Sequence, residues 1–174
     1  MLKYLNVKVK KGFTLLEVTI AIFILLVGVT AGSVLIARTV SQMSVFSSKL
    51  IAAYLTQEGI EIIRNIRDTN WLQGGAWDEG LTGCFFTGCE ADYTATTVEN
   101  PPGATAYFET FANNFLKIDI SGFYNYTSGT DTKYKRKITI VSGADILTVT
   151  VETTWSEKGK DYSHIAQEIL YNWK

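Results

Sequence analysis

Proline is scarce in this chain. Its 174 residues include two prolines, the adjacent Pro101 and Pro102. No proline lies between Phe13 and Asp68. Because proline in a helix interior removes a backbone hydrogen bond and clashes with the preceding turn, its absence permits one continuous helix over this span. We expect a single helix of about 55 residues there, roughly 80 Å long at the usual rise per residue.

Histidine and net charge are also scarce. His164 is the one histidine, the formal net charge is −1, and the isoelectric point is near 5.9. Without an excess of positive charge, the surface as a whole has no field that would hold nucleic acid or an anionic membrane. His164 falls in an expected strand, and the sequence contains no H-E-x-x-H, G-x-S-x-G or Walker pattern. We therefore expect no enzymatic activity and no cofactor.

Two cysteines, Cys84 and Cys89, are separated by four residues in the stretch C-F-F-T-G-C. Two cysteines allow one disulfide within the chain, which excludes a disulfide-rich scaffold. An extracellular location favours the Cys84–Cys89 disulfide, and two free thiols are the alternative. A C-x4-C pair without further cysteine or histidine nearby is a poor zinc site, so we expect no metal there.

Acidic and amide side chains gather at Asp68, Asn70, Asp78 and Glu79. Oxygen ligands of this kind suit calcium, but their spacing does not match an EF-hand loop. We prefer the interpretation that they form a solvated acidic loop, and we expect no metal here either.

In contrast to these absences, one long stretch of the chain is strongly apolar. Val18 to Ala37 is a run of 20 residues without a charge, which is the length needed to cross the hydrocarbon core of a bilayer. Four lysines and no acid lie in the eleven residues at the start of the chain. Since positively charged flanks stay cytoplasmic, the rest of the chain should be exported.

A cleaved secretory signal is the alternative to a retained anchor. Val29-Thr30-Ala31 resembles its small-residue cleavage site. The apolar run nevertheless continues to Ala37, and Glu17 interrupts the part that a signal peptide keeps apolar. A carboxylate at the edge of a membrane segment needs a reason, because charges in lipid are costly. These features favour an anchor that is kept.

The stretch Lys11-Gly12-Phe13-Thr14-Leu15-Leu16-Glu17 carries a family resemblance. It resembles the processing site of type IV prepilins and pseudopilins, in which a short basic leader and a Gly precede a Phe or Met and then Thr-Leu-Leu/Ile-Glu at the start of an apolar helix. The close match covers roughly residues 1–37. The later chain is similar to this family only in its architecture, with some likeness to minor pilins at Trp155 and at residues 171–173.

The resemblance implies specific processing and a specific role for one acid. A prepilin peptidase would cut between Gly12 and Phe13, and the new amino group of Phe13 would be methylated. Glu17 would then meet the Phe13 amine of a neighbouring subunit, so that a charge finds its partner on assembly. Physical chemistry supports each part of this scheme. Gly12 breaks the helix at the cut, an acid in the first turn suits the helix dipole, and positions four apart stack on one helix face. A chance acid reaching the lipid headgroups is the alternative for Glu17.

Four segments follow from this interpretation. Residues 1–12 are a basic leader that is removed, 13–37 a transmembrane or filament-core helix, 38–68 the amphipathic half of the same helix, and 69–174 a globular head with a variable loop. The amphipathic half carries apolar residues at steps of three and four, in two rows: Met43, Phe46, Leu50, Ala53, Ile60 and Ile63, then Ile51, Leu55, Ile62 and Ile66. We expect the head to cover this stripe.

Two positions inside the apolar run bear on packing. Gly28 and Gly32 form G-x-x-x-G, which is typical of close helix packing, although small residues are also common in membrane helices. Val34 stands where many major pilins have a helix-kinking proline, and this favours a minor subunit.

The C-terminal half has the pattern of a sheet. We expect residues 71–103 to be a long connection, and Leu116, Ile118 and Ile120 to alternate with polar residues in a strand. Apolar and polar residues alternate in the same way from Leu147 to Trp155. Residues 142–145 read as a turn between strands 133–141 and 146–155, and residues 158–161 as the next turn before a strand that includes residues 165–173. The predicted fold class is α+β, with a long N-terminal helix packed on a C-terminal antiparallel sheet, as in a pilin.

Two weaker motifs lie in this half. The run Lys133-Tyr134-Lys135-Arg136-Lys137 could contact phosphates of nucleic acid. A charged edge strand that resists aggregation explains it as well, and nucleic-acid contact is the less favoured interpretation. Alternation would place Tyr134 and Arg136 on one face and the flanking lysines on the other. Asn125-Tyr126-Thr127 fits a glycosylation sequon, which is a weak three-residue match.

The sequence therefore predicts a non-enzymatic filament subunit of a type IV pilus or a type II secretion-like pseudopilus. By resemblance, its partners are other pilin or pseudopilin subunits, the prepilin peptidase and a membrane platform with an ATPase. The chain would lie first in the cytoplasmic (inner) membrane with its head outside the cytoplasm, and then in a surface pilus or a periplasmic pseudopilus. The alternatives are a single-pass anchored binding module that does not polymerise, and a secreted enzyme beginning near Gly32.

Overall fold

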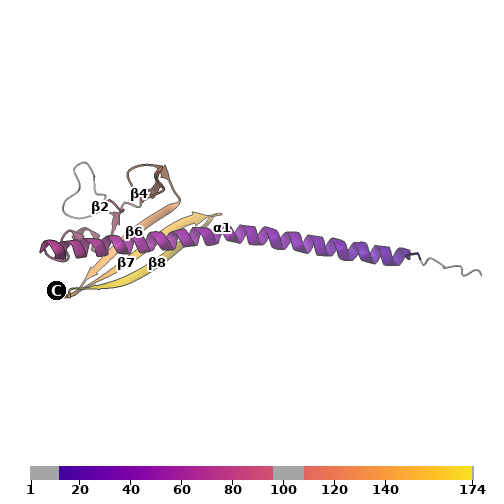
Figure 1. Cartoon of the computed structure of the whole chain (residues 1–174), viewed down its shortest axis with the longest axis horizontal. Helices are drawn as coiled ribbons and strands as arrows, with labels where there is room; N and C mark the ends of the chain where they lie inside the picture. The colour runs from indigo at the N-terminus through magenta and orange to yellow at the C-terminus, as the bar shows by residue number, and fades with distance from the viewer. Residues whose placement is uncertain (1–11, 96–107, 174) are drawn as a thin grey trace, which may run out of the picture. The chain divides into compact units, whose positions relative to one another are not determined.

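The computed structural model describes residues 12–95 and 108–173. One helix, α1 (Leu15–Gln73), has 59 residues and is followed by antiparallel strands (Figure 1). This confirms the predicted α+β fold class with a long N-terminal helix. The helix continues for more than a turn beyond Asp68, because no residue before Gly74 breaks it. Gly74 has φ +78°, a left-handed conformation that glycine adopts without strain and that commonly ends helices.

The chain divides into two compact units, residues 1–44 and residues 45–174, which we describe separately. In the first unit, α1 exposes its large apolar side chains from Leu15 to Met43. The second unit, which we call the head, contains the rest of α1 and all the strands.

The elements that follow the helix are a 3-10 turn and eight strands. They are η1 (Leu81–Cys84), β1 (Cys89–Ala91), β2 (Phe108–Thr110), β3 (Lys117–Ile118), β4 (Tyr124–Asn125), β5 (Thr130–Asp131), β6 (Tyr134–Ser142), β7 (Ile146–Glu157) and β8 (Lys160–Tyr171). The large sheet has the order β2-β1-β6-β7-β8 and the small one β4-β3-β5, with every pair antiparallel.

The three long strands confirm the predicted meander and both of its turns. β6 and β7 are joined by Gly143–Asp145, and Gly143 N donates to Ile146 O at 2.8 Å. β7 and β8 are joined at Lys158 and Gly159. Odd positions of β7 from Leu147 to Trp155 are buried and even positions are not, which is the alternation read from the sequence.

The core of the head lies between the helix and the large sheet. Its main cluster unites helix residues such as Ile63 and Ile66 with Val149 and Val151 of β7 and with the disulfide. The helical pattern was right for Leu55, Ile60, Ile62, Ile63 and Ile66, which are buried. It was wrong for Met43, Phe46 and Leu50, which are exposed, because the sheet covers a helix face that begins at Ser48 and Ala52.

Two expectations about the middle of the chain need correction. Residues 71–103 are not all connection, since Trp71 is helical and β1 joins the large sheet beside β6; the part from 96 lies outside the described residues. Ile120 is fully exposed and β3 ends at Ile118, because Asp119 Oδ1 accepts the backbone N–H of Ser121 and turns the chain. Leu116 is buried, as expected of an inward-facing residue.

Candidate functional site

The first site is the start of α1, where Thr14 caps the helix. Thr14 Oγ1 accepts a hydrogen bond from Glu17 N at 3.2 Å, and Thr14 O accepts one from Val18 N. Thr14 and Glu17 thus have the spacing T-x-x-E of a capping box, a helix-start signal that is present in the sequence itself. The cap places the Glu17 carboxylate in the first turn, where the positive end of the helix dipole favours an acid.

Phe13 lies just before this cap and outside the helix. In the uncleaved chain α1 begins at Leu15, so Phe13 and Glu17 do not share a helix face before processing. Gly12, Phe13 and Glu17 are all exposed. The scissile bond that the resemblance implies would lie between two exposed residues immediately before a capped helix. The residues of the leader up to 11 lie outside the described part of the chain.

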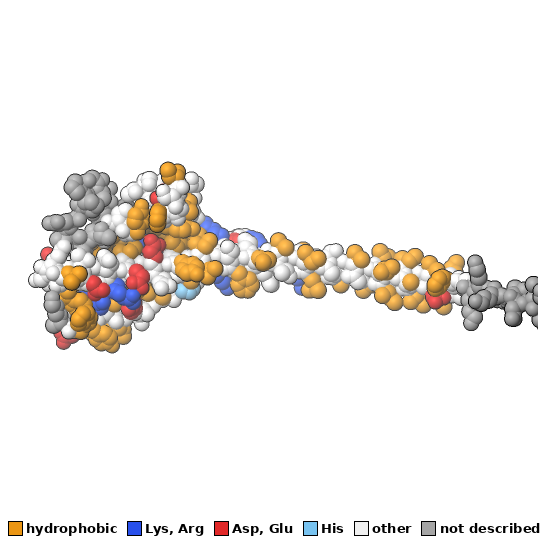
Figure 2. All heavy atoms as spheres, viewed as in Figure 1, with side chains coloured by type: hydrophobic (Ala, Val, Ile, Leu, Met, Phe, Trp, Pro, Cys, Tyr) orange, Lys and Arg blue, Asp and Glu red, His pale blue; other side chains and the backbone are white. Residues whose placement is uncertain are grey.

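The second site is the apolar surface of residues 15–44. Its most apolar 18-residue window has a mean hydropathy of 2.7 and none of it is buried, so this part of α1 is long and apolar enough to span a membrane. Hydrophobic side chains follow one another along this part of the helix (Figure 2). Thr19, Thr30 and Ser33 donate their hydroxyl groups to carbonyls three or four residues earlier, which satisfies polar groups inside an apolar run. Gly28 and Gly32 have open space around them.

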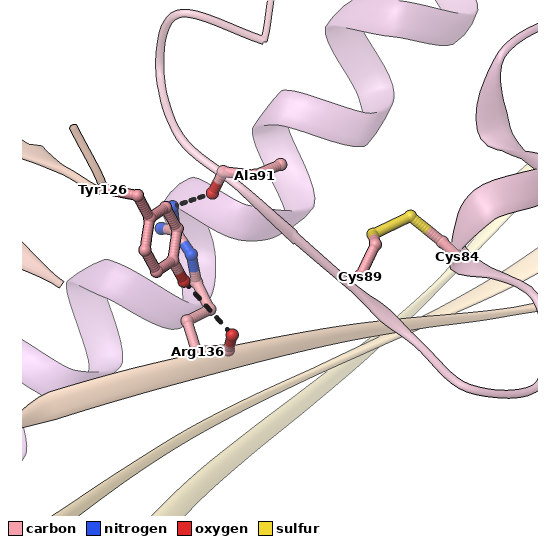
Figure 3. The surroundings of a disulfide bond; sticks show 5 residues. All are labelled: Cys84, Cys89, Ala91, Tyr126 and Arg136. Carbon is pink, nitrogen blue, oxygen red and sulfur yellow. Dashed lines mark hydrogen bonds between the residues drawn. A yellow bond between two sulfur atoms is a disulfide. The ribbon is translucent and has the colours of Figure 1, made fainter. Parts of the chain in front are cut away.

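The third site is the loop closed by Cys84 and Cys89, which are bonded to each other (Figure 3). Both cysteines are buried, and Phe85 forms a parallel bridge to Ile140 of β6. Gly88 also packs closely on β6, since a Cβ there would lie 3.0 Å from Ile138 O. The loop is thus fixed to the sheet at its base, while Phe86 at its tip is 95% exposed with φ +63°.

A buried arginine joins the helix to the strands near this loop. Arg136 on β6 is fully buried, and its Nη1 donates to Leu55 O at 2.8 Å and to Glu58 Oε2 at 3.0 Å. Its Nη2 donates to Ala91 O of β1, while its own carbonyl accepts from Tyr126 Oη (Figure 3). The strand confirms that Tyr134 and Arg136 share a face, and the structure shows that this face is the buried one, so this guanidinium is not placed to contact phosphates.

The other basic residues of that run have local partners too. Lys133 Nζ donates to Ser48 Oγ and to Glu157, while Lys135 and Lys137 lie over the rings of Phe115 and Phe111. The edge-strand interpretation of this run was wrong, because β6 lies between β1 and β7.

Asn125 and His164, which the sequence singled out, both take part in hydrogen bonds within the head. Asn125 is 2% exposed and its Oδ1 accepts from the backbone of Thr127 and Ser128, which argues against glycosylation there. His164 lies half-buried on β8, and its carbonyl accepts from Thr56 Oγ1.

The acidic segment after the helix is organised by Asn70. Asn70 is buried and its Nδ2 donates to the carbonyls of Trp77 and Glu79, while Asp68 pairs with Arg67. Within residues 12–95 and 108–173, no three His, Cys, Asp or Glu side chains gather as they would around a metal ion.

An ion pair between Arg64 and Glu168 links the helix to β8. Arg64 Nη2 donates to both carboxylate oxygens of Glu168, and Arg64 Nη1 donates to Glu61. The hydrogen bond to Glu168 is the main reason that the pKa of Arg64 is raised above its usual value. This charge-assisted contact of one guanidinium nitrogen with both carboxylate oxygens fixes β8, the strand at the edge of the sheet, to the helix.

A family model described as the prokaryotic N-terminal methylation motif matches residues 7–33. The matched segment includes Gly12, Phe13, the capped start of α1 and most of the exposed apolar run. No curated protein and no solved structure matches the chain. The family evidence therefore comes from the N-terminal segment, and the head is described by its own geometry.

Proposed function

We infer that this chain, whose N-terminal methylation motif supports its place in the type IV prepilin and pseudopilin family, is a structural subunit of a type IV pilus or of a related secretion pseudopilus. The observation that carries the proposal is the coincidence of the motif with a capped helix whose apolar run is entirely exposed. An exposed apolar surface of this size needs either lipid or neighbouring copies to cover it.

The proposed sequence of events starts in the cytoplasmic membrane. The apolar run holds the chain there with its head outside the cytoplasm, and a prepilin peptidase cuts between Gly12 and Phe13. Residues 13–37 then exchange lipid for the helices of other subunits, and the segment 38–68 continues the helix to the globular part of residues 69–174. An assembly platform with an ATPase supplies the work of removing the anchor from lipid.

In this proposal Glu17 selects the position of the incoming subunit. Its carboxylate is exposed at the first turn of α1, and after cleavage the amine of Phe13 on a neighbour is the cation it meets. In a medium of low dielectric constant an unpaired carboxylate is costly, so the pair would form only in the register that brings both charges together. Val34 predicts that this chain is a minor subunit. The ratio of this chain to the other subunits in isolated filaments tests that prediction.

The decisive experiment is N-terminal sequencing of the chain produced with and without a prepilin peptidase. A mature chain beginning at methylated Phe13 supports the proposal. A chain that keeps Met1 with the peptidase present supports the anchored module that does not polymerise, and one beginning near Gly32 supports a secreted protein. Gly12→Val should block the cut, whereas the control Gly32→Ala should be cut normally, because nothing lies within 4 Å of the added Cβ.

A further inference from the structure

The head has two ends that differ in shape and charge. At one end the strands meet the helix near Ser48, where Tyr134 Oη donates to Ser48 O and Lys49 lies over the ring of Tyr162. At the other end Trp173, which follows β8, packs against Trp71 near the end of the helix, with 4.5 Å between the ring centroids. We call these the Ser48 end and the Trp71 end.

The Trp71 end presents an exposed aromatic side chain on a fixed loop. Phe86 follows Phe85, which is bridged to Ile140 near the end of β6, and the disulfide closes the loop around it. A phenylalanine with φ +63° is uncommon and costs conformational energy, so the surrounding structure must impose it. An aromatic residue on a backbone that is already fixed loses little backbone entropy on binding, and exposed aromatic side chains are typical interface anchors.

Acidic groups accompany this side chain. Four carboxylates belong to this end of the head, namely Asp68, Asp78, Glu79 and Asp145. Among the described residues they are accompanied by the cations Arg67 and Lys137, the latter with its side chain against Gly88 of the disulfide loop. Glu79 and Asp145 are exposed. Among these described residues the Trp71 end is therefore acidic.

The Ser48 end contains a groove of about 870 Å³. Aromatic side chains of Phe115, Trp155 and Tyr162 line it, together with Thr154 and Ser163 from neighbouring strands. The rings of Trp155 and Tyr162 are stacked, with 5.5 Å between their centroids. The Nε1–H of the buried Trp155 has no acceptor among the described residues. A groove of this size accommodates a phenyl ring and the chain that carries it.

Basic groups outnumber acidic groups around this groove. The cations at the Ser48 end are Lys49, Lys133, Lys135, Lys158 and Lys160, and the acids are Asp131, Glu157 and Asp161. The charge of this end is thus opposite in sign to that of the Trp71 end. Opposite charges on the two ends favour contact between the unlike ends of two copies and oppose contact between like ends.

We propose that heads of this chain dock end to end, with Phe86 of one copy inserted in the Ser48-end groove of the next. The contact is heterologous: the two copies use different surfaces, so it propagates in one direction instead of closing a pair. Every copy in such a contact keeps the same orientation, as a filament requires. The inference rests on the proposed function as a filament subunit and requires neighbouring copies of this chain in the filament, so it stands against the minor role predicted from Val34. It adds to the proposed function a contact between named residues of two heads.

The test uses filaments from cells that express the full-length chain with the photoreactive p-benzoyl-phenylalanine in place of Phe86. Irradiation should give a cross-linked dimer of this chain, with the cross-link mapped to peptides that carry groove residues such as Thr154 or Ser163. The same photoreactive residue in place of the fully exposed Ile120 is the matched control and should give at least fivefold less of that dimer.

A second variant blocks the groove without touching the loop. Ser163→Tyr should reduce the cross-link from position 86 at least fivefold, while head folding, followed by tryptophan fluorescence, is unchanged. A cross-link from position 86 to another position 86, or to a different protein, would overturn the end-to-end contact. Filaments that contain this chain but give no cross-link would also overturn it, whereas absence of the processed chain from filaments would instead overturn the proposed function.

Discussion

Arg136 donates from Nη1 to the carbonyl oxygen of Leu55 at 2.8 Å, so a charged side chain on β6 binds the backbone of the long helix. Because Nη2 of the same guanidinium reaches Ala91 O, one residue holds the helix, β1 and β6 together. This contact fixes the strand that follows the disulfide loop.

Replacing Arg136 should destabilise the head. Arg136→Met leaves the buried Ala91 carbonyl without its donor and removes the ion pair with Glu58, and we expect a loss on the order of 3 kcal/mol in the free energy of unfolding. Urea unfolding of the full chain in detergent, followed by tryptophan fluorescence, measures it. Lys135→Met, one residue away on the opposite face, is the control and should change stability by less than about 1 kcal/mol. Equal losses in the two variants would contradict the role of the guanidinium.

Gly59 is required by close packing and not by backbone conformation. A Cβ at this position would lie 2.8 Å from Val151 Cγ1 and 3.1 Å from Arg136 Cδ. Gly59→Ala should therefore cost about 1–3 kcal/mol through overpacking, despite the gain of about 1 kcal/mol in helix propensity. The double variant with Val151→Ala should recover part of the loss.

The control for this prediction is Gly32→Ala, where no atom lies within 4 Å. It should leave the unfolding of the isolated chain unchanged or slightly more favourable. A Gly59→Ala chain as stable as the parent would show that the helix and β7 separate more easily than the packing indicates.

The disulfide should matter more for the loop than for the whole head. Replacing both Cys84 and Cys89 by serine removes a short cross-link that is worth about 2 kcal/mol in the chain-entropy model. We expect proteolysis within residues 84–89 to accelerate, as followed by mass spectrometry of the fragments. Cleavage of the β7–β8 turn at Lys158, measured in the same samples, is the control and should not change. Parallel acceleration at both places would indicate general unfolding instead.

Alkaline pH should destabilise the head through Tyr134. Burial, and to a lesser degree the charge of Glu157, raise the pKa of Tyr134 above its usual value of 10.0, while a hydrogen bond with the Ser48 side chain opposes this shift. Since the folded state favours the neutral phenol, its contribution to stability is full below about pH 10 and is lost as the pH rises through the folded pKa. Urea midpoints between pH 8 and pH 12 measure the loss. Tyr134→Phe should show a smaller decline than the parent, whereas Tyr171→Phe, at an exposed position, should follow the parent.

Glu17 should be needed for assembly and not for processing. Glu17→Ala keeps Gly12 and Phe13, so cleavage should persist, but the carboxylate that would meet the neighbour's amine is gone. Filament incorporation, measured by immunoblot of sheared filaments, should fall at least tenfold. Thr14→Ala is a useful comparison, because it removes the helix cap at a cost of about 1 kcal/mol and keeps the charge. Normal incorporation of the Glu17→Ala chain would refute the assembly role.

The sequence was most informative where the pattern is local. The uncharged run after Glu17, the absence of proline up to Asp68 and the alternation in residues 146–155 predicted the helix and the meander. It was less informative about which helix face is covered. Phe46 and Leu50 fit the apolar periodicity as well as Ile63 does, but the sheet reaches only the face that contains Ala52 and Thr56.

The sequence by itself determined the processing motif, the apolar run and the order of helix and long strands, because each depends on neighbouring residues and on regular periods of the chain. Only the tertiary structure decided that Arg136 points inward, that β1 pairs with β6, and that Phe86 and the groove at Trp155 lie at opposite ends of the head. These depend on contacts between residues far apart in the chain, whose energies no local pattern records.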